Sequence, residues 1–168
     1  MSASEPRLAA LQELQELIDN SWAKASPGAR ASWPPETRMS AAQAVAFLEG
    51  QRYCAVATVT GQGDPHLAPC AFLSLEDGSF WLPAVAQALR LRHLRRRPRL
   101  ALVVGQGVGP EHQVVLARGP VVMIAVPEVP PAVLSRAEHK LGSTRWAGTW
   151  IHLVGERLLA YRGDAGAG

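Results

Sequence analysis

The chain has 168 residues, the size of one ordinary domain, and is 48% hydrophobic and 18% charged, which excludes a disordered or low-complexity protein. Its formal net charge of +3 is too small to indicate nucleic-acid binding by itself. No segment approaches the roughly 18 apolar residues of a membrane span, and the first residues lack a secretory signal pattern. We therefore expect a cytoplasmic protein with neither a nucleic-acid nor a membrane partner.

The positive charge is concentrated in one segment. The chain has 15 Arg and 2 Lys, and six of the arginines lie within residues 90–99. On a helix, Leu91 and Leu94 share one face, and this spacing predicts that Arg92, His93 and Arg96 point away from it. Three interpretations stay open: a solvated basic face, a site for a phosphate ester, or a nucleic-acid surface. The last is disfavoured because no aromatic residues alternate with the arginines.

The first fifty residues are predicted to be helical. Apolar residues from Leu8 to Trp22 recur at helical spacing, which indicates an amphipathic helix. Residues 26–37 read as a proline-containing linker. Ser40 and Gln43 then form the signature of a capping box, opening a short helix that Gly50 ends.

From residue 53 onward the chain changes to short strands joined mostly by turns. The first two strands are expected to form a hairpin around residues 61–65, and the last two a closing hairpin around Gly155-Glu156. Helices are expected within residues 83–97 and 130–141. This order favours an antiparallel barrel over βαβ layers. The predicted strands are 53–60, 67–73, 79–82, 100–104, 113–118, 121–126, 152–154 and 158–161.

Self-sufficient catalytic motifs are missing from the sequence. The glycines of residues 105–110 do not form a dinucleotide-binding loop, because Pro110 takes the third glycine position and a strand follows. Cys54 and Cys70 lack metal-ligand spacing, so we expect free thiols and no metal site. No paired carboxylates, serine elbow or Cys–His pair is present. Any demanding chemistry is therefore expected to come from a cofactor. Three histidines look isolated: His66, His112 and His152.

The order of several segments is distinctive: Ala55–Val59, Gly63–His66, Leu67–Pro69, Asp77-Gly78 and Arg90–Pro98. This series resembles the pyridoxamine 5'-phosphate oxidase-like family of flavin-binding split barrels. The resemblance runs from Ser40 to Val126 and more weakly to Tyr161, and the first helix and Trp146–Trp150 are similar to actinobacterial members. It implies a mainly β fold, an antiparallel six-stranded split β-barrel in residues 39–168, with an N-terminal helical extension and linker in residues 1–38.

The resemblance also implies a cofactor and a set of residues that bind it. Family members are homodimers that hold FMN, or in some branches a deazaflavin or haem, between two barrels. The backbone of one strand lies along the flavin ring, a glutamine contacts the ring, and a strand end with the following helix holds the phosphate. In this chain the strand along the ring would be Ala68, Pro69, Cys70 and Ala71, and the glutamine would be Gln113. The strand end and helix that hold the phosphate would contribute Leu82, Ala84 and Arg90.

The phosphate-binding positions depart from the family pattern. Ala84 stands where a threonine is usual, and Ala88 and Leu89 stand where hydroxyl or basic residues precede the family's lysine, whose place is taken by Arg90. Each hydrogen bond to a charged phosphate contributes about 1.5–3 kcal/mol. Two hypotheses follow: an FMN-dependent oxidoreductase of unknown substrate, or a non-catalytic barrel that sequesters a deazaflavin or haem. Pyridoxamine phosphate oxidation itself is not expected, because substrate-phosphate residues are not found after Tyr161.

Overall fold

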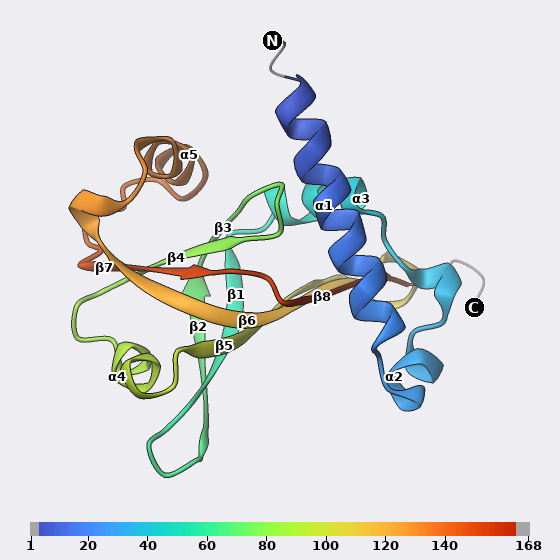
Figure 1. Ribbon diagram of the computed structural model, residues 1–168, viewed down its shortest axis with the longest axis horizontal. Helices are drawn as coiled ribbons and strands as arrows, with labels where there is room; N and C mark the ends of the chain where they lie inside the picture. Colours follow the sequence, from blue (N-terminus) through green and yellow to red (C-terminus); the bar gives the residue numbers. More distant parts are fainter. Residues whose placement is uncertain (1–3, 164–168) are drawn as a thin grey trace.

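The computed structural model describes residues 4–163. Eight antiparallel strands form one curled sheet in the order β2-β1-β5-β6-β7-β4-β3, with β8 also paired to β6. Helices flank the sheet, and the N-terminal helix crosses one end of it (Figure 1). The predicted split barrel with its N-terminal helical extension is thus confirmed, although the sheet has eight strands instead of six, among them the two-residue strand β3. The strands are β1 Tyr53–Val59, β2 Pro65–Ala71, β3 Leu73–Ser74, β4 Phe80–Ala84, β5 Arg99–Gln106, β6 Gln113–Ala125, β7 Thr149–Leu153 and β8 Arg157–Arg162. The helices are α1 Ser4–Ala23, α2 Pro27–Ser32, α3 Ala41–Glu49, α4 Leu89–Arg96 and α5 Pro131–Leu141, with short 3-10 turns at Pro35–Thr37, Gly109–Glu111 and Val126–Glu128.

The longest strand, β6, joins the two parts of the sheet. The prediction of separate strands at 113–118 and 121–126 is wrong, because β6 continues through Gly119-Pro120 over 13 residues. Its first half pairs with β5 and β8, and its second half pairs with β7. A Cβ on Gly119 would overlap the carbonyl oxygen of Val154, so only glycine allows the crossing chain to approach this closely.

The predicted closing hairpin is also wrong. β7 and β8 do not pair with each other; each pairs with a different half of β6. Their connection follows β6: the Val154 N–H donates to the Pro120 carbonyl at 3.2 Å, and the Glu156 N–H donates to the Arg118 carbonyl at 3.0 Å. The turn residues therefore move the chain along one partner strand instead of folding it back on itself.

The barrel is open along a seam between β2 and β4, because β2 ends the strand order and has no hydrogen-bonded neighbour beyond β1. Pro69, which has no N–H, is tolerated there because β2 is an edge strand. The Phe72 N–H donates to the Arg52 carbonyl at 3.2 Å, so the backbone of Phe72 faces β1. In an antiparallel pair every second residue of a strand bonds to the neighbouring strand, and the residues between point their backbone groups the other way. By that alternation, the backbone groups of Leu67, Pro69 and Ala71 face the open edge.

Two apolar clusters hold the elements together. The main core lies inside the curled sheet, and Leu14 and Ile18 of α1 with Phe47 of α3 close one end of it. A smaller cluster under α5 contains Trp81 and Trp150. The helices predicted at the positions of α1, α3, α4 and α5 are confirmed. Because α1 buries Leu14 and Ile18 in the main core, it is an integral part of the packing.

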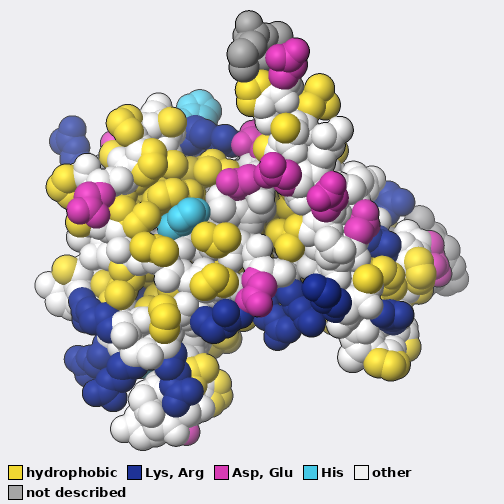
Figure 2. Space-filling view, in the orientation of Figure 1, with side chains coloured by type: hydrophobic (Ala, Val, Ile, Leu, Met, Phe, Trp, Pro, Cys, Tyr) yellow, Lys and Arg dark blue, Asp and Glu magenta, His cyan; other side chains and the backbone are white. Residues whose placement is uncertain are grey.

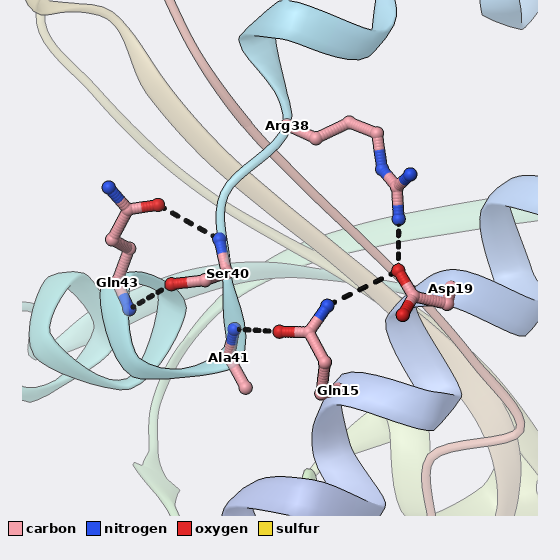
Figure 3. A network of polar contacts seen from close by, with 6 residues as sticks. All are labelled: Gln15, Asp19, Arg38, Ser40, Ala41 and Gln43. Carbon is pink, nitrogen blue, oxygen red and sulfur yellow. Dashed lines mark hydrogen bonds and ion pairs between the residues drawn. The ribbon is translucent and has the colours of Figure 1, made fainter.

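Polar contacts fix the N-terminal segment to the barrel (Figure 3). Gln15 of α1 accepts a hydrogen bond from the Ala41 N–H at 2.8 Å and donates to Asp19 at 3.2 Å, and Asp19 also pairs with Arg38. The capping box predicted at Ser40 is present: its N–H donates to the Gln43 side chain at 2.9 Å, and its hydroxyl accepts from the Gln43 N–H at 3.3 Å.

The stretch read as a linker contains short helical turns. α2 begins after Ser26, whose hydroxyl accepts a hydrogen bond from the Ala29 N–H at 3.2 Å, and a 3-10 turn follows at Pro35–Thr37. Prolines at the first helical positions preset the backbone for these turns. Among residues 4–163, no helix combines the length and apolarity needed to cross a bilayer.

Candidate cofactor cleft

A cleft of about 240 Å³ lies at the open seam, between the edge of β2 and the end of β4. One side is formed by β2 and the start of β1, and the other by the end of β4, the first turn of α4 and the segment after α5. The cleft is therefore built from five separate parts of the chain. Its lining residues are Arg52, Tyr53, Pro69, Cys70, Ala71, Pro83, Arg90, Leu141 and Trp146.

Arg90 supplies a positive charge inside this cleft. One Nη donates a long hydrogen bond of 3.4 Å to the Pro83 carbonyl, and among the described residues its buried Nε has no hydrogen-bond acceptor. Buried guanidinium donors without a partner are rare in folded proteins. The fork geometry of guanidinium suits two oxygens of a phosphate. The unpaired donor therefore fits a phosphate-bearing ligand at the α4 end of the cleft.

The two cysteines lie beneath the cleft on paired strands. Cys54 and Cys70 are direct cross-strand partners, and both are buried and free. Burial, helped by the neighbouring Cys70, raises the pKa of the Cys54 thiol to about 12, although Arg90 opposes the shift. Burial likewise raises the pKa of Cys70. Both thiols are therefore neutral near pH 7 and provide neither a thiolate nucleophile nor a thiolate ligand.

Two exposed aromatic residues form walls of the cleft, and the sequence reasoning did not identify them as site residues. Tyr53 is 71% exposed and Trp146 is 50% exposed. Large aromatic side chains on the surface commonly mark places where a planar ligand or a partner packs. Arg52 and Leu141 also line the cleft. Of the two aromatic residues, only Trp146 had a signal in the sequence, the segment flanked by tryptophans after α5.

The structure brings together part of the predicted site. Pro69, Cys70, Ala71 and Arg90 line the one cleft, and Ala68 precedes them on β2. Three other predicted residues lie elsewhere in the single chain. Leu82 and Ala84 on β4 are fully buried in the main core, and Gln113 begins β6, which β5 separates from β1.

A larger cavity of about 740 Å³ lies beside the cleft, between α3 and α5, and shares Arg52 with it. Its most unusual group is Lys140, whose pKa is lowered to about 8 by burial, partly offset by Glu49. The Lys140 ammonium donates to the Leu48 carbonyl at 2.9 Å and lies 4.2 Å from the centre of the Phe72 ring. These contacts cap the end of α3, so Lys140 has a structural role.

One histidine of α4 is oriented against the sequence prediction. His93 does not point to solvent: it is 6% exposed, and its Nδ1 lies 2.9 Å from the Thr58 hydroxyl. His66, which looked isolated, lies against it with ring centres 5.0 Å apart. His152 stacks on Trp81. None of these rings lines the cleft.

The curled sheet with a cleft at its open seam defines the class of small split-barrel proteins. The sequence profile of the pyridoxamine 5'-phosphate oxidase family matches residues 40–149, more than half of the chain. The chain belongs to this family. Among curated proteins, no sequence is similar enough to count as a match.

Solved structures with the same fold have diverged far in sequence. A conserved hypothetical protein from Mycobacterium tuberculosis has 21% identity and a TM-score of 0.64, covering 77% of this chain and 89% of its own. The heme storage protein HutZ from Vibrio cholerae has 14% identity and a TM-score of 0.58, covering 70% and 92%. An FAD-binding protein from Mycobacterium smegmatis has 12% identity and a TM-score of 0.57, covering 75% and 98%. At these identities the similarity shows the fold.

Proposed function

We propose that this chain binds FMN in the β2–β4 cleft and acts as a flavin-dependent oxidoreductase. The observation that carries the proposal is Arg90, which lines the cleft and whose buried Nε has no hydrogen-bond partner among the described residues. Family membership adds support, as does an FAD-binding protein of the same fold. A bound flavin would supply the redox chemistry, which no group of the cleft can supply alone.

The chain's own residues would bind and orient the cofactor. The guanidinium of Arg90 would hold the phosphate, and the outward backbone groups of Leu67, Pro69 and Ala71 would lie along the ring edge. The ring of Trp146 and the pyrrolidine of Pro69 offer apolar packing surfaces on the walls. The neutral Cys70 thiol beneath the ring would leave the electrostatics to Arg90 and Arg52.

The outer face of β1 and β2 supports a homodimer that closes this cleft. The outward side chains of β1 are all apolar, where a solvent-facing sheet would alternate to polar residues. Tyr53 and Leu67 are 71% and 69% exposed on this face. Tyr53, Pro69 and Ala71 belong both to this face and to the cleft lining. A second copy covering the face would therefore shield the cofactor from water. Gln113 does not line the cleft of its own chain, and in a dimer Gln113 of one copy would be available to the cleft of the other.

The haem alternative has less support at this site. The haem storage protein shares the fold, but no histidine lines the cleft, and Cys70 is kept neutral by its raised pKa. A deazaflavin shares the phosphate and the planar ring of FMN, so Arg90 would hold it equally well. Both molecules therefore serve as competing ligands in a binding experiment.

The test is an absorbance and fluorescence titration of the apoprotein with FMN, a deazaflavin coenzyme and haem. We expect FMN to bind, and the Arg90→Ala variant to lose at least about tenfold in affinity because a charge-assisted phosphate contact is removed. Arg95→Ala is the matched control: it removes the same charge from the same helix, but Arg95 is exposed and lies outside the cleft. Equal losses in the two variants, or a preparation that binds only haem, would refute the proposal.

The dimer has its own measurement. Light scattering on the eluting protein should give twice the mass of the chain, and Leu67→Arg should produce monomers because it places a charge on the apolar face. Leu8→Arg serves as control, because Leu8 is 59% exposed on α1, away from this face. A monomeric native protein that binds FMN fully would contradict the role given to the second copy.

A further inference from the structure

One side of α4, from Leu89 to Arg96, and the turn between β1 and β2 line a second, separate cleft of about 380 Å³. The proposed flavin site does not involve it, since the two clefts share no lining residue. Basic side chains gather over α4 at the lower left of Figure 2. The residues that line this cleft, here called the α4 basic cleft, are Thr60, Gly61, Gln62, Leu89, Arg92, His93 and Arg96.

Hydrogen-bond donors dominate the walls of the α4 basic cleft. Arg92 and Arg96 lie one helical turn apart, so their side chains project from the same side of α4. On the opposite wall, the N–H groups of Gly61 and Gln62 have no backbone acceptor in the described part of the chain. Asp64, the acid of this turn, is not among the lining residues. Guanidinium groups and backbone amides are both donors that can bind an oxyanion, and both belong to residues that line this cleft.

His93 is held in place as a further donor or acceptor of the cleft. Its Nδ1 is fixed by the Thr58 hydroxyl at 2.9 Å, and the ring is packed against His66. The ring is buried on its other sides but belongs to the cleft lining. A histidine anchored through one nitrogen offers the other at a defined position, as binding sites for anions require.

The arginines of α4 are not neutralised by neighbouring acids. Among residues 4–163, the ion pairs involve Arg38, Arg99 and Arg136, and none involves an arginine of α4. Like charges four residues apart destabilise a helix, and the dipole at a helix C-terminus offsets only about half an elementary charge. The helix therefore carries more positive charge than its own structure compensates.

Arg96 is also constrained by the turn opposite. Its guanidinium lies so close to Gly61 that a Cβ at that position would overlap it. Glycine thus lets the guanidinium lie directly on the turn backbone, beside the free N–H groups.

We propose that the α4 basic cleft is a binding site for a phosphate group of a small molecule, separate from the flavin site. Arg92 and Arg96 donate hydrogen bonds to the phosphate oxygens, and His93 and the backbone amides of the turn provide the remaining contacts. The guanidinium fork matches phosphate better than it matches a spherical anion such as chloride.

The test uses inorganic phosphate and pyrophosphate as probes in calorimetric titrations of the full chain. The Arg92→Ala/Arg96→Ala double variant should lose at least about tenfold in affinity, because two charge-assisted contacts are removed. The Arg95→Ala/Arg97→Ala double variant removes the same charge from exposed positions outside the cleft and should stay within about twofold. All four arginines are exposed, so both variants should fold, which thermal unfolding verifies.

Two further arms distinguish this site from the flavin site and from a nucleic-acid surface. Arg90→Ala should remove only the phosphate binding that FMN competes with, and the Arg92→Ala/Arg96→Ala variant should leave FMN binding within about twofold, because the clefts are separate. The resonances of the His93 ring should shift as phosphate is added. Equal losses in the two double variants, no binding of either probe, or tight binding of duplex DNA without binding of either probe would overturn the proposal.

Discussion

Two sides of α4 carry arginines in different surroundings. In the first turn, Arg90 is partly buried, lines the cleft at the β2–β4 seam, and has no hydrogen-bond partner for Nε among the described residues. On the other side of the helix, Arg92 and Arg96, four residues apart, are exposed and line a cleft with polar residues of the β1–β2 turn. Desolvation would strengthen a phosphate contact made by Arg90, whereas solvent would screen the contacts made by Arg92 and Arg96. The run of arginines in the sequence therefore does not show how their surroundings differ: Arg90 is partly buried, whereas Arg92 and Arg96 are exposed.

The largest effect is expected from removing a buried side chain that anchors α4, the helix that bears all three arginines. Leu94 is buried in the main core at 1% exposure, so Leu94→Ala should lower the free energy of unfolding by about 2–5 kcal/mol. Leu89, on the same helix but 47% exposed, is the control, and Leu89→Ala should change it by less than about 0.5 kcal/mol. Denaturant unfolding measures both. Similar losses in the two variants would mean that α4 is not anchored as described.

The next effect concerns the support of His93. Thr58→Val removes the hydroxyl that pairs with the buried Nδ1, which should cost about 1–3 kcal/mol of stability and weaken phosphate binding at the α4 basic cleft. FMN binding should be unchanged. Thr58→Ser retains the hydroxyl and should restore phosphate affinity. If serine fails to restore it while the stability recovers, the hydroxyl does not position the ring.

A pH dependence should follow from the same ring. Burial, together with His66 and Arg92, lowers the pKa of His93. The ring of His93 therefore takes up a proton more readily in the unfolded chain than in the folded one. Its contribution to the free energy of unfolding is complete above the unfolded pKa of about 6.5 and is lost as the pH falls below that value. The charged or titratable groups around it are His66 on β2 and Arg92 and Arg96 on α4. His93→Gln should flatten the decline in unfolding free energy between roughly pH 7 and 5; an unchanged slope would assign the decline to other groups.

The smallest effect is expected at the turn opposite Arg96. Gly61→Ala forces the guanidinium aside, which should weaken phosphate binding by about threefold while leaving FMN binding unchanged. The control is Gln62→Ala at the next position of the turn, which keeps the backbone N–H and should have a lesser effect. Titration with inorganic phosphate compares them. A larger loss for Gln62→Ala would show that the side chain, not the turn backbone, contributes the contact.

Much of the fold followed from local patterns, and the errors came from long-range pairing. The capping box at Ser40, the helix of α5 and the first hairpin were predictable because adjacent residues determine them. β6 was divided wrongly because Gly119-Pro120 reads locally as a turn, although pairing on both sides keeps it extended. The β7–β8 hairpin failed for the same reason. Strand partners are chosen by the whole sheet, which short-range signals do not encode.

The lining of the candidate cleft was predictable in part, where one segment contributes several residues. Pro69, Cys70 and Ala71 follow one another, and Arg90 stands out by its charge, so the resemblance pointed to all four. Tyr53 and Trp146 reach the same cleft only through folding. His93 was placed on the wrong side because a single stripe of leucines underestimates how much of α4 is buried where it packs against β1.

The most direct measurement of the central claim compares FMN with riboflavin, which lacks the phosphate. If Arg90 holds the phosphate, native protein should bind FMN more tightly than riboflavin by about tenfold or more, and Arg90→Ala should bring the two affinities together by weakening FMN alone. A native protein that binds both ligands equally, or an Arg90→Ala variant that keeps the full preference for FMN, would contradict the account.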